Sequence, residues 1–176
     1  KAEIETALRS DSLAGFQLLD LQDFPGQGTA LVGILDAFMD SKNIVSSEIW
    51  RQSCNDVVLL LEFEKYCWTD KDNFNSELRV VNYSNRDIKD NIICEIKNTK
   101  GEIIAQKKFP ESVIPKGKIS TIGFFNYKLN DLLCPQRLNV ELRFEKEGYS
   151  NSYPLWIYDS QPKSLDMDAI VVAESL

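Results

Sequence analysis

The sequence contains no histidine in its 176 residues. Histidine is the commonest general base and the commonest metal ligand of proteins, and it activates the nucleophile in Ser-His and Cys-His systems. Those mechanisms are therefore excluded. Any chemistry of this chain must use carboxylates, lysine, tyrosine or cysteine.

Long apolar runs and closely spaced cysteines are also missing. No stretch approaches the ~20 apolar residues that a membrane-spanning helix needs, so the sequence predicts no membrane span. The four cysteines form no C-x-x-C pair for zinc or redox chemistry, and we expect neither a metal nor a cofactor. Three disulfide pairings remain open, but free buried thiols are favoured for Cys54, Cys67, Cys94 and Cys134.

Positive charge is scarce. The chain has 20 Lys and Arg against 27 Asp and Glu, a net charge of -7. Domains that bind nucleic acid usually carry a basic face that neutralises phosphates. We therefore expect neither nucleic acid nor an anionic membrane surface as a partner.

The first 50 residues have the pattern of an α/β segment. A short helical pattern contains Ile4, Ala7 and Leu8, and the apolar run at residues 15–21 predicts a buried strand. After a loop, Thr29 is a suitable N-cap for a helix with one apolar face, formed by Leu31, Ile34, Leu35 and Phe38. A single strand needs neighbours for its backbone groups, so this segment belongs in a larger α/β layer or barrel.

The rest of the chain reads mainly as strands. Apolar and polar residues alternate strictly through 138–145, and Ile92, Cys94 and Ile96 alternate with Ile93, Glu95 and Lys97, as expected of strands with one buried face. Five further candidates are Val57–Phe63, Glu77–Tyr83, Ile103–Phe109, Ile119–Phe125 and Tyr153–Tyr158. Seven short strands over about 100 residues predict an immunoglobulin-like β-sandwich. The predicted fold class is mainly β, with that sandwich preceded by the α/β segment.

The predicted organisation has four parts. The α/β segment occupies residues 1–50, a connector 51–56 and the sandwich 57–159. Residues 160–176 form a linker and an apolar β-branched run, which resembles the first strand of a further, truncated domain.

Two groups of side chains are candidates for sugar recognition. Asp20 and Asp23 could act as a carboxylate pair, although solvated or helix-capping roles are commoner for loop carboxylates. Trp68, Tyr153 and Trp156 could form an aromatic platform, although core positions are commoner for aromatic residues of a small sandwich.

The run G-F-Q-L-L-D-L-Q-D-F-P-G-Q-G-T-A-L-V-G-I-L-D-A-F, residues 15–38, resembles bacterial glycoside hydrolases related to family 2, the β-galactosidase and β-glucuronidase group. In that family it is similar to the last strand of the catalytic (β/α)8 barrel, the active-site loop and the last helix. Further similar pieces are Ser47–Arg51, Val57–Leu61, Val81–Tyr83 and Asn151–Tyr158. The resemblance implies that the chain is a C-terminal fragment whose residues 1–50 are the terminal α/β piece of a barrel.

The same resemblance implies a function for the parent protein. It would hydrolyse glycosidic bonds in carbohydrate metabolism by the retaining route, with a carbohydrate as substrate. The family's nucleophile and general acid/base lie on earlier barrel strands, so no catalytic residue is expected here and the chain alone should be inactive. Asp20, Gln22 and Asp23 match the strand end and the loop that meet substrate. A periplasmic or extracellular location is implied by the resemblance alone.

One departure from the family matters. Better-known members carry a strand of the form G-F-x-W-D-W-x-D-Q, whereas this sequence has Asp20 at the second tryptophan and Gln22-Asp23 in place of Asp-Gln. The identity of the sugar is therefore not implied.

The alternative functions come from other classes. The sandwich could be a carbohydrate-binding or protein-interaction module without a catalytic parent. Self-association through the truncated α/β piece would cover its apolar strand.

Overall fold

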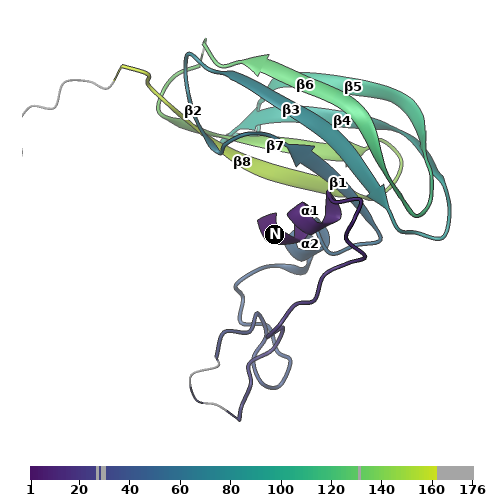
Figure 1. Ribbon diagram of the computed structural model, residues 1–176. Coiled ribbons are helices and arrows are strands. Elements are labelled where there is room, and N and C mark those ends of the chain that lie inside the picture. Colours follow the sequence, from purple (N-terminus) through teal and green to yellow (C-terminus); the bar gives the residue numbers. More distant parts are fainter. Residues whose placement is uncertain (27, 29–30, 131, 162–176) are drawn as a thin grey trace, which may run out of the picture.

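The computed structural model describes every residue except 27, 29–30, 131 and 162–176, so the predicted final strand lies outside the described residues. Two sheets pack face to face, with two short helices beneath them (Figure 1). The first sheet has the order β1 (Val57–Glu62), β3 (Asn73–Asn82), β6 (Lys118–Lys128). The second has the order β2 (Cys67–Thr69), β8 (Ser150–Tyr158), β7 (Gln136–Phe144), β4 (Ile88–Asn98), β5 (Ile103–Ile114). The helices are α1 (Ala2–Leu8) and α2 (Ser47–Arg51).

The predicted mainly-β sandwich is confirmed. All seven expected strands are present. The chain crosses between the sheets from β1 to β2, β2 to β3, β3 to β4, β5 to β6 and β6 to β7, as expected of a β-sandwich. Sequence reasoning missed β2, which has only three residues and pairs in parallel with β8. A strand of that length is too short for an alternating pattern.

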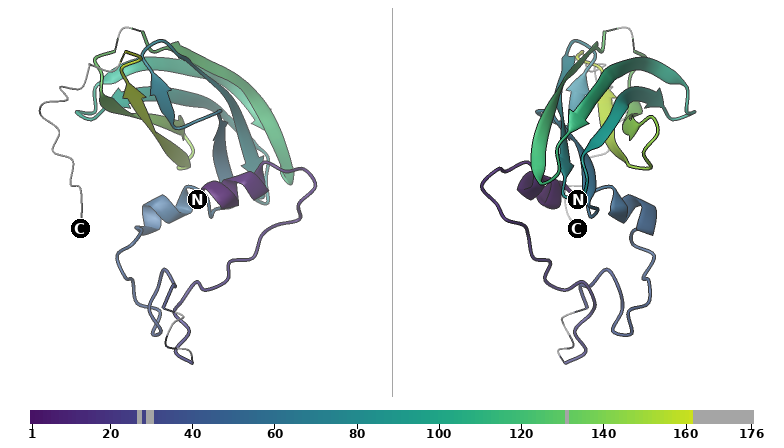
Figure 2. Two further views of the ribbon diagram at one scale, coloured as in Figure 1. Left: turned by 60° about the vertical axis from the view of Figure 1, so that its left-hand side comes forward. Right: turned by 90° about the vertical axis from the view of Figure 1, so that its right-hand side faces the viewer.

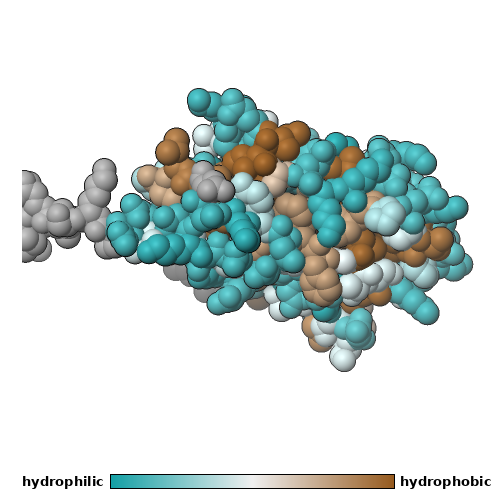
Figure 3. All heavy atoms as spheres, turned by 90° about the horizontal axis from the view of Figure 1, so that it is seen from above, coloured by the Kyte–Doolittle hydropathy of each residue, from teal (hydrophilic) through white to brown (hydrophobic). Residues whose placement is uncertain are grey.

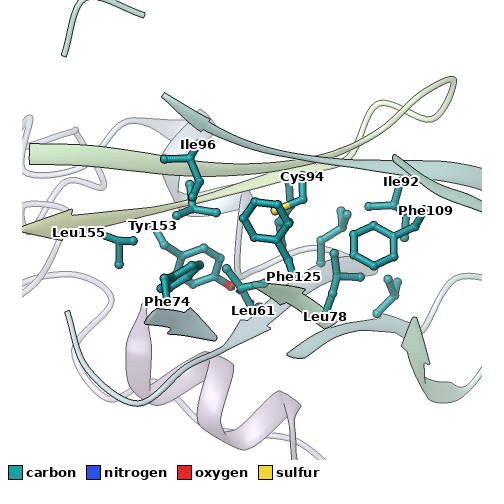
Figure 4. Packing of buried hydrophobic residues seen from close by; sticks show 14 of the residues in the cluster. Leu61, Phe74, Leu78, Ile92, Cys94, Ile96, Phe109, Phe125, Tyr153 and Leu155 are labelled. Atoms are coloured by element: carbon teal, nitrogen blue, oxygen red, sulfur yellow. Dashed lines mark hydrogen bonds between the residues drawn. The ribbon is translucent and has the colours of Figure 1, made fainter. Parts of the chain in front are cut away.

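The core lies between the two sheets and is built from one face of each strand. On β7 the inward side chains Leu138, Val140, Leu142 and Phe144 are all buried, as their alternation predicts. Tyr153 of β8 projects into the same core, where its hydroxyl accepts a 3.1 Å hydrogen bond from the backbone N–H of Leu61 (Figure 4). Trp68 is also buried in this core.

Strand β1 is buried on both faces. Val57, Leu59 and Leu61 enter the main core, while the alternate residues Val58 and Leu60 form a second cluster with α1. Ile4 and Leu8 of α1 cover that outer face, which explains why the sequence Val-Val-Leu-Leu-Leu does not alternate.

The described residues of the segment 10–46, which we call the extended segment, lie away from the sandwich between the two helices (Figures 1 and 2). The strand predicted at residues 15–21 and the helix predicted after Thr29 were wrong: the described residues of this segment hold only isolated β-bridges, Gln22 to Leu35 and Leu35 to Ser41. The physical reason is that neither sheet reaches this segment, so an extended run here has no strand to pair with. Asp20, at a φ of 61°, also interrupts the extended backbone.

Three further features follow from the described residues. Neither helix in them has the length and hydropathy needed to cross a bilayer. The four cysteines are free thiols, and burial raises the pKa of Cys94 to about 12. Seen from above, hydrophobic side chains form separate groups on a largely hydrophilic surface (Figure 3).

Candidate functional site

The three predicted substrate-binding residues lie in the extended segment but in different environments. The side chain of Asp20 is partly exposed and that of Gln22 is exposed. Asp23 is buried, with 6% of its surface accessible. A ligand could therefore reach the side chains of Asp20 and Gln22, whereas the side chain of Asp23 is buried.

The carboxylate of Asp23 is already occupied by partners from its own segment. One oxygen accepts a 2.8 Å hydrogen bond from the backbone N–H of Gly33, and Lys42 Nζ lies 2.9 and 3.1 Å from the two oxygens. Lys42 also donates to the carbonyl groups of Leu31 and Gly33. The hydrogen bond from Lys42, supported by the Gly33 amide, lowers the pKa of Asp23 against the opposing effect of burial. Asp23 therefore holds this segment together.

Backbone contacts complete this arrangement. The N–H of Asp23 donates to the carbonyl of Leu35 at 3.0 Å, and the N–H of Leu35 donates to the carbonyl of Leu21 at 3.0 Å. Gly33 lies so close to this pairing that a Cβ there would be 2.3 Å from the carbonyl carbon of Gln22 and 2.4 Å from the N of Asp23. Glycine is required at position 33 because any side chain would collide with backbone.

The extended segment presents many large apolar side chains to solvent. Leu19 is 86% exposed and Phe38 is 85% exposed. Others with more than two fifths of their surface accessible are Leu13, Phe16, Leu18, Leu21, Phe24, Leu31, Val32, Met39 and Ile44. So many exposed large apolar side chains within one segment are unusual, because burial of apolar surface is the main favourable contribution to folding.

A second candidate site lies on the outer face of the five-stranded sheet. We call it the β7–β8 groove; its volume is about 530 Å³, and its walls are Lys97, Asn98, Thr99, Gly101, Arg137, Leu138, Asn139, Glu141 and Ser152. The alternation of β7 and β8 could have predicted these outward positions, because Arg137, Asn139 and Glu141 occupy every second residue.

A network of charged and polar side chains from β4, β5 and β7 lies next to this groove. Glu95 of β4, only 4% exposed, receives hydrogen bonds from Gln106 at 2.6 Å and lies 3.2 Å from Lys97 and 3.4 Å from Arg143. Burial opposes ionisation of Glu95, but these partners outweigh it and its pKa is lowered. Lys97 also pairs with Glu141, and this hydrogen bond raises the pKa of Lys97.

Of the three aromatic candidates, Trp156 lies on the outer face of β8 beside the groove, where it is the cross-strand partner of Arg137. Trp68 and Tyr153 are core residues, so they cannot form a surface platform. Trp156 is partly exposed, and the guanidinium of Arg137 lies over its ring, 5.9 Å from the centroid. Trp68 and Tyr153 thus take the core positions that the sequence favoured, and Trp156 has an accessible ring with an arginine over it.

Neither candidate site offers a metal centre. Across the part of the chain that the structure describes, no three Cys, Asp or Glu side chains cluster as ligands would. The polar groups of both sites are instead suited to hydrogen bonding and ion pairing.

Comparison with known proteins found likenesses of low identity. The chain is similar to a β-glucosidase from Erythrobacter marinus (TM-score 0.43, 12% identity, 57% of this chain and 15% of that chain). It is also similar to a family 2 β-glucuronidase (0.41, 15%, 57% and 11%) and to a CARDB domain from Pyrococcus furiosus (0.45, 7%, 59% and 94%). The chain thus spans a small part of both glycosidases. TM-scores below 0.5 carry no argument about its function.

No curated protein matches the sequence. A family model described as "Domain of unknown function (DUF8488)" matches residues 72–159, which is half of the chain and covers the sandwich from the start of β3 to the end of β8. The chain therefore belongs to this DUF8488 family.

Proposed function

We propose that this chain forms the C-terminal part of a glycoside hydrolase related to family 2. In this proposal residues 1–50 complete a catalytic barrel formed by further polypeptide, and the sandwich follows the barrel. The observation that carries the proposal concerns the extended segment. Asp23 holds its described residues together through Gly33 and Lys42, yet many of its large apolar side chains are exposed to solvent.

Two properties of this segment support the proposal. Burying a Leu or Phe side chain contributes roughly 1.5–3 kcal/mol, so exposing as many as this segment does would be costly unless another surface covers them. The same residues form the 24-residue run that resembles the end of a family 2 barrel. A missing barrel would supply both the strands and the helices that this segment lacks.

In the parent protein the predicted site residues would have different roles. Asp20 and Gln22 have accessible side chains and would hydrogen-bond hydroxyl groups of a carbohydrate substrate at the strand ends. Asp23, which is bound to Lys42 and Gly33, would hold the loop in place. The nucleophile and the general acid/base would come from strands outside this chain.

The test is an assay of the longer protein with aryl glycosides. Losing a charged hydrogen bond to substrate costs ~1.5–3 kcal/mol, so Asp20→Ala should lower kcat/KM by roughly 10- to 150-fold, with only the small loss of stability that alanine brings at a φ of 61°. Asp23→Ala should lower the melting temperature as well. Asp11→Ala, which removes an exposed carboxylate of the same segment, is the matched control and should change neither.

The chain by itself should show no turnover, because in this proposal the nucleophile and the general acid/base lie on barrel strands outside it. Turnover by the pure chain that Asp20→Ala abolishes would overturn the proposal. So would unchanged kinetics in every variant of the longer protein.

Self-association is the competing way to cover the same apolar side chains. Sedimentation of the pure chain distinguishes the two. A stable dimer that dissociates when Leu19 and Phe38 are both replaced by serine would favour an interaction module over a barrel fragment.

A further inference from the structure

The β7–β8 groove contains an arginine, Arg137, that is not used in an internal ion pair by the described residues. Within that part of the chain, Arg137 makes no ion pair and no side-chain hydrogen bond, and its guanidinium lies over the ring of Trp156. Four of the other five arginines pair with a glutamate, namely Arg9, Arg79, Arg86 and Arg143. Arg51 of α2 resembles Arg137 in having no ion pair within the described residues, but it lies outside this groove. An unpaired guanidinium can bind an external carboxylate through two parallel hydrogen bonds.

Next to Arg137 the groove offers groups that suit hydroxyl ligands. Asn139 donates a 3.0 Å hydrogen bond to Glu141, which also pairs with Lys97, so all three side chains are held in defined positions. Ser152 lies on the neighbouring strand, directly opposite Glu141. A preorganised set of amide, carboxylate and ammonium groups both donates to and accepts from sugar hydroxyls.

An apolar hollow adjoins the groove along β8. It has a volume of about 400 Å³, shares Ser152 with the groove, and is lined by Tyr66, Pro154 and Trp156 among others. Aromatic side chains combine apolar area with a polar edge, which suits the apolar face of a sugar ring. Polar and aromatic surfaces thus lie side by side on one sheet face.

We propose that the β7–β8 groove binds an oligosaccharide that carries a carboxylate, such as a chain of uronic acids. Arg137 pairs with the carboxylate, Asn139 and Glu141 bind hydroxyls, and Trp156 packs against a ring. This site goes beyond the proposed function, because it lies on the sandwich and needs no barrel and no hydrolysis.

The experiment is a calorimetric titration of the 176-residue chain with an oligogalacturonate and with a neutral cello-oligosaccharide of equal length. The oligogalacturonate should bind more tightly, by about tenfold or more, because only it satisfies Arg137. The chain carries a net charge of -7, so a polyanion is not attracted by the chain as a whole and binding reports a local site.

Variants locate the site. Arg137→Ala and Trp156→Ala should each weaken binding of the oligogalacturonate by about tenfold or more, and Arg137→Lys should lose less than Arg137→Ala. Lys89→Ala removes the same charge from an exposed position on β4 outside the groove, and it should bind as the original chain does.

Three results would overturn the proposal: no binding of the oligogalacturonate, equal binding of the neutral oligosaccharide, or equal losses in Arg137→Ala and Lys89→Ala. Circular dichroism and melting of each variant show whether a loss reflects unfolding. Because the titration uses no catalytic parent, its outcome is independent of the glycosidase assay.

Discussion

The side-chain amide of Asn151 on β8 donates a 2.9 Å hydrogen bond to Oε1 of Glu5 on α1, joining residues 146 positions apart. Glu5 is 1% exposed and Asn151 is 1% exposed. The same amide lies 2.7 Å from the carbonyl of Leu59 and 2.8 Å from the hydroxyl of Tyr153. These buried hydrogen bonds attach α1 to the sandwich.

Asn151→Ala should therefore destabilise the chain by roughly 2–4 kcal/mol, since it leaves the Glu5 carboxylate buried without this donor. Urea unfolding measures the difference. Ser150→Ala, at an exposed position of the same strand, is the control and should change the free energy of unfolding by less than about 0.5 kcal/mol. Equal effects of the two substitutions would show that the Glu5 contact is unimportant.

Gly33→Ala should loosen the extended segment. Its Cβ would meet backbone atoms of Gln22 and Asp23 at 2.3–2.4 Å, so the pairing of residues 21–23 with Leu35 must open. Hydrogen exchange of the Asp23 and Leu35 amides should accelerate by about tenfold or more. Gly28→Ala, where a Cβ meets nothing within 4 Å, should leave both rates as they are.

The carboxylate of Asp90 should make the free energy of unfolding depend on pH. Burial alone would raise its pKa, but the backbone N–H groups of Glu147, Lys146 and Asn91 donate to its carboxylate and lower the pKa below the ordinary 3.8. A lowered pKa in the folded state stabilises the chain above the ordinary value, and this contribution is lost as pH falls through the folded pKa.

The corresponding measurement is the free energy of unfolding of the original chain and of Asp90→Asn between about pH 6 and pH 2. Near pH 6 the original chain should be more stable than Asp90→Asn by roughly 1–3 kcal/mol, and this difference in the free energy of unfolding should decrease toward pH 2. A gap that stays constant across this range would mean that the charge of Asp90 contributes nothing.

The cysteines should differ in reactivity. Cys67 is exposed, whereas burial raises the pKa of Cys94 to about 12 and keeps it a thiol. A thiol reagent at neutral pH should label Cys67 first and should label Cys94 only after the chain unfolds. Mass spectrometry of the labelled peptides measures the order, and rapid native labelling of Cys94 would contradict the buried placement of β4.

The strands of the sandwich could be predicted because their pattern is local. On β7, one apolar residue in two is enough to specify a strand with one buried face, and the structure buries that face. The same rule could not find β2, whose three residues become a strand only because β8 lies beside them. It also could not show that Val58 and Leu60 are buried by α1, a helix at the N-terminal side of the extended segment, well before the sandwich in the chain.

The sequence by itself determined the mainly-β class, the seven longer strands and the absence of histidine chemistry, since each depends on composition or on neighbours in the chain. Only the tertiary structure decided that Asp23 pairs with Lys42, that Trp68 and Tyr153 belong to the core, and that Arg137 stacks on Trp156. It also decided that residues 15–21 form no strand, although their apolar pattern suits one. The physical reason is that a strand, an ion pair and a stacked ring all need partners from distant parts of the chain, and only folding brings those partners within contact distance.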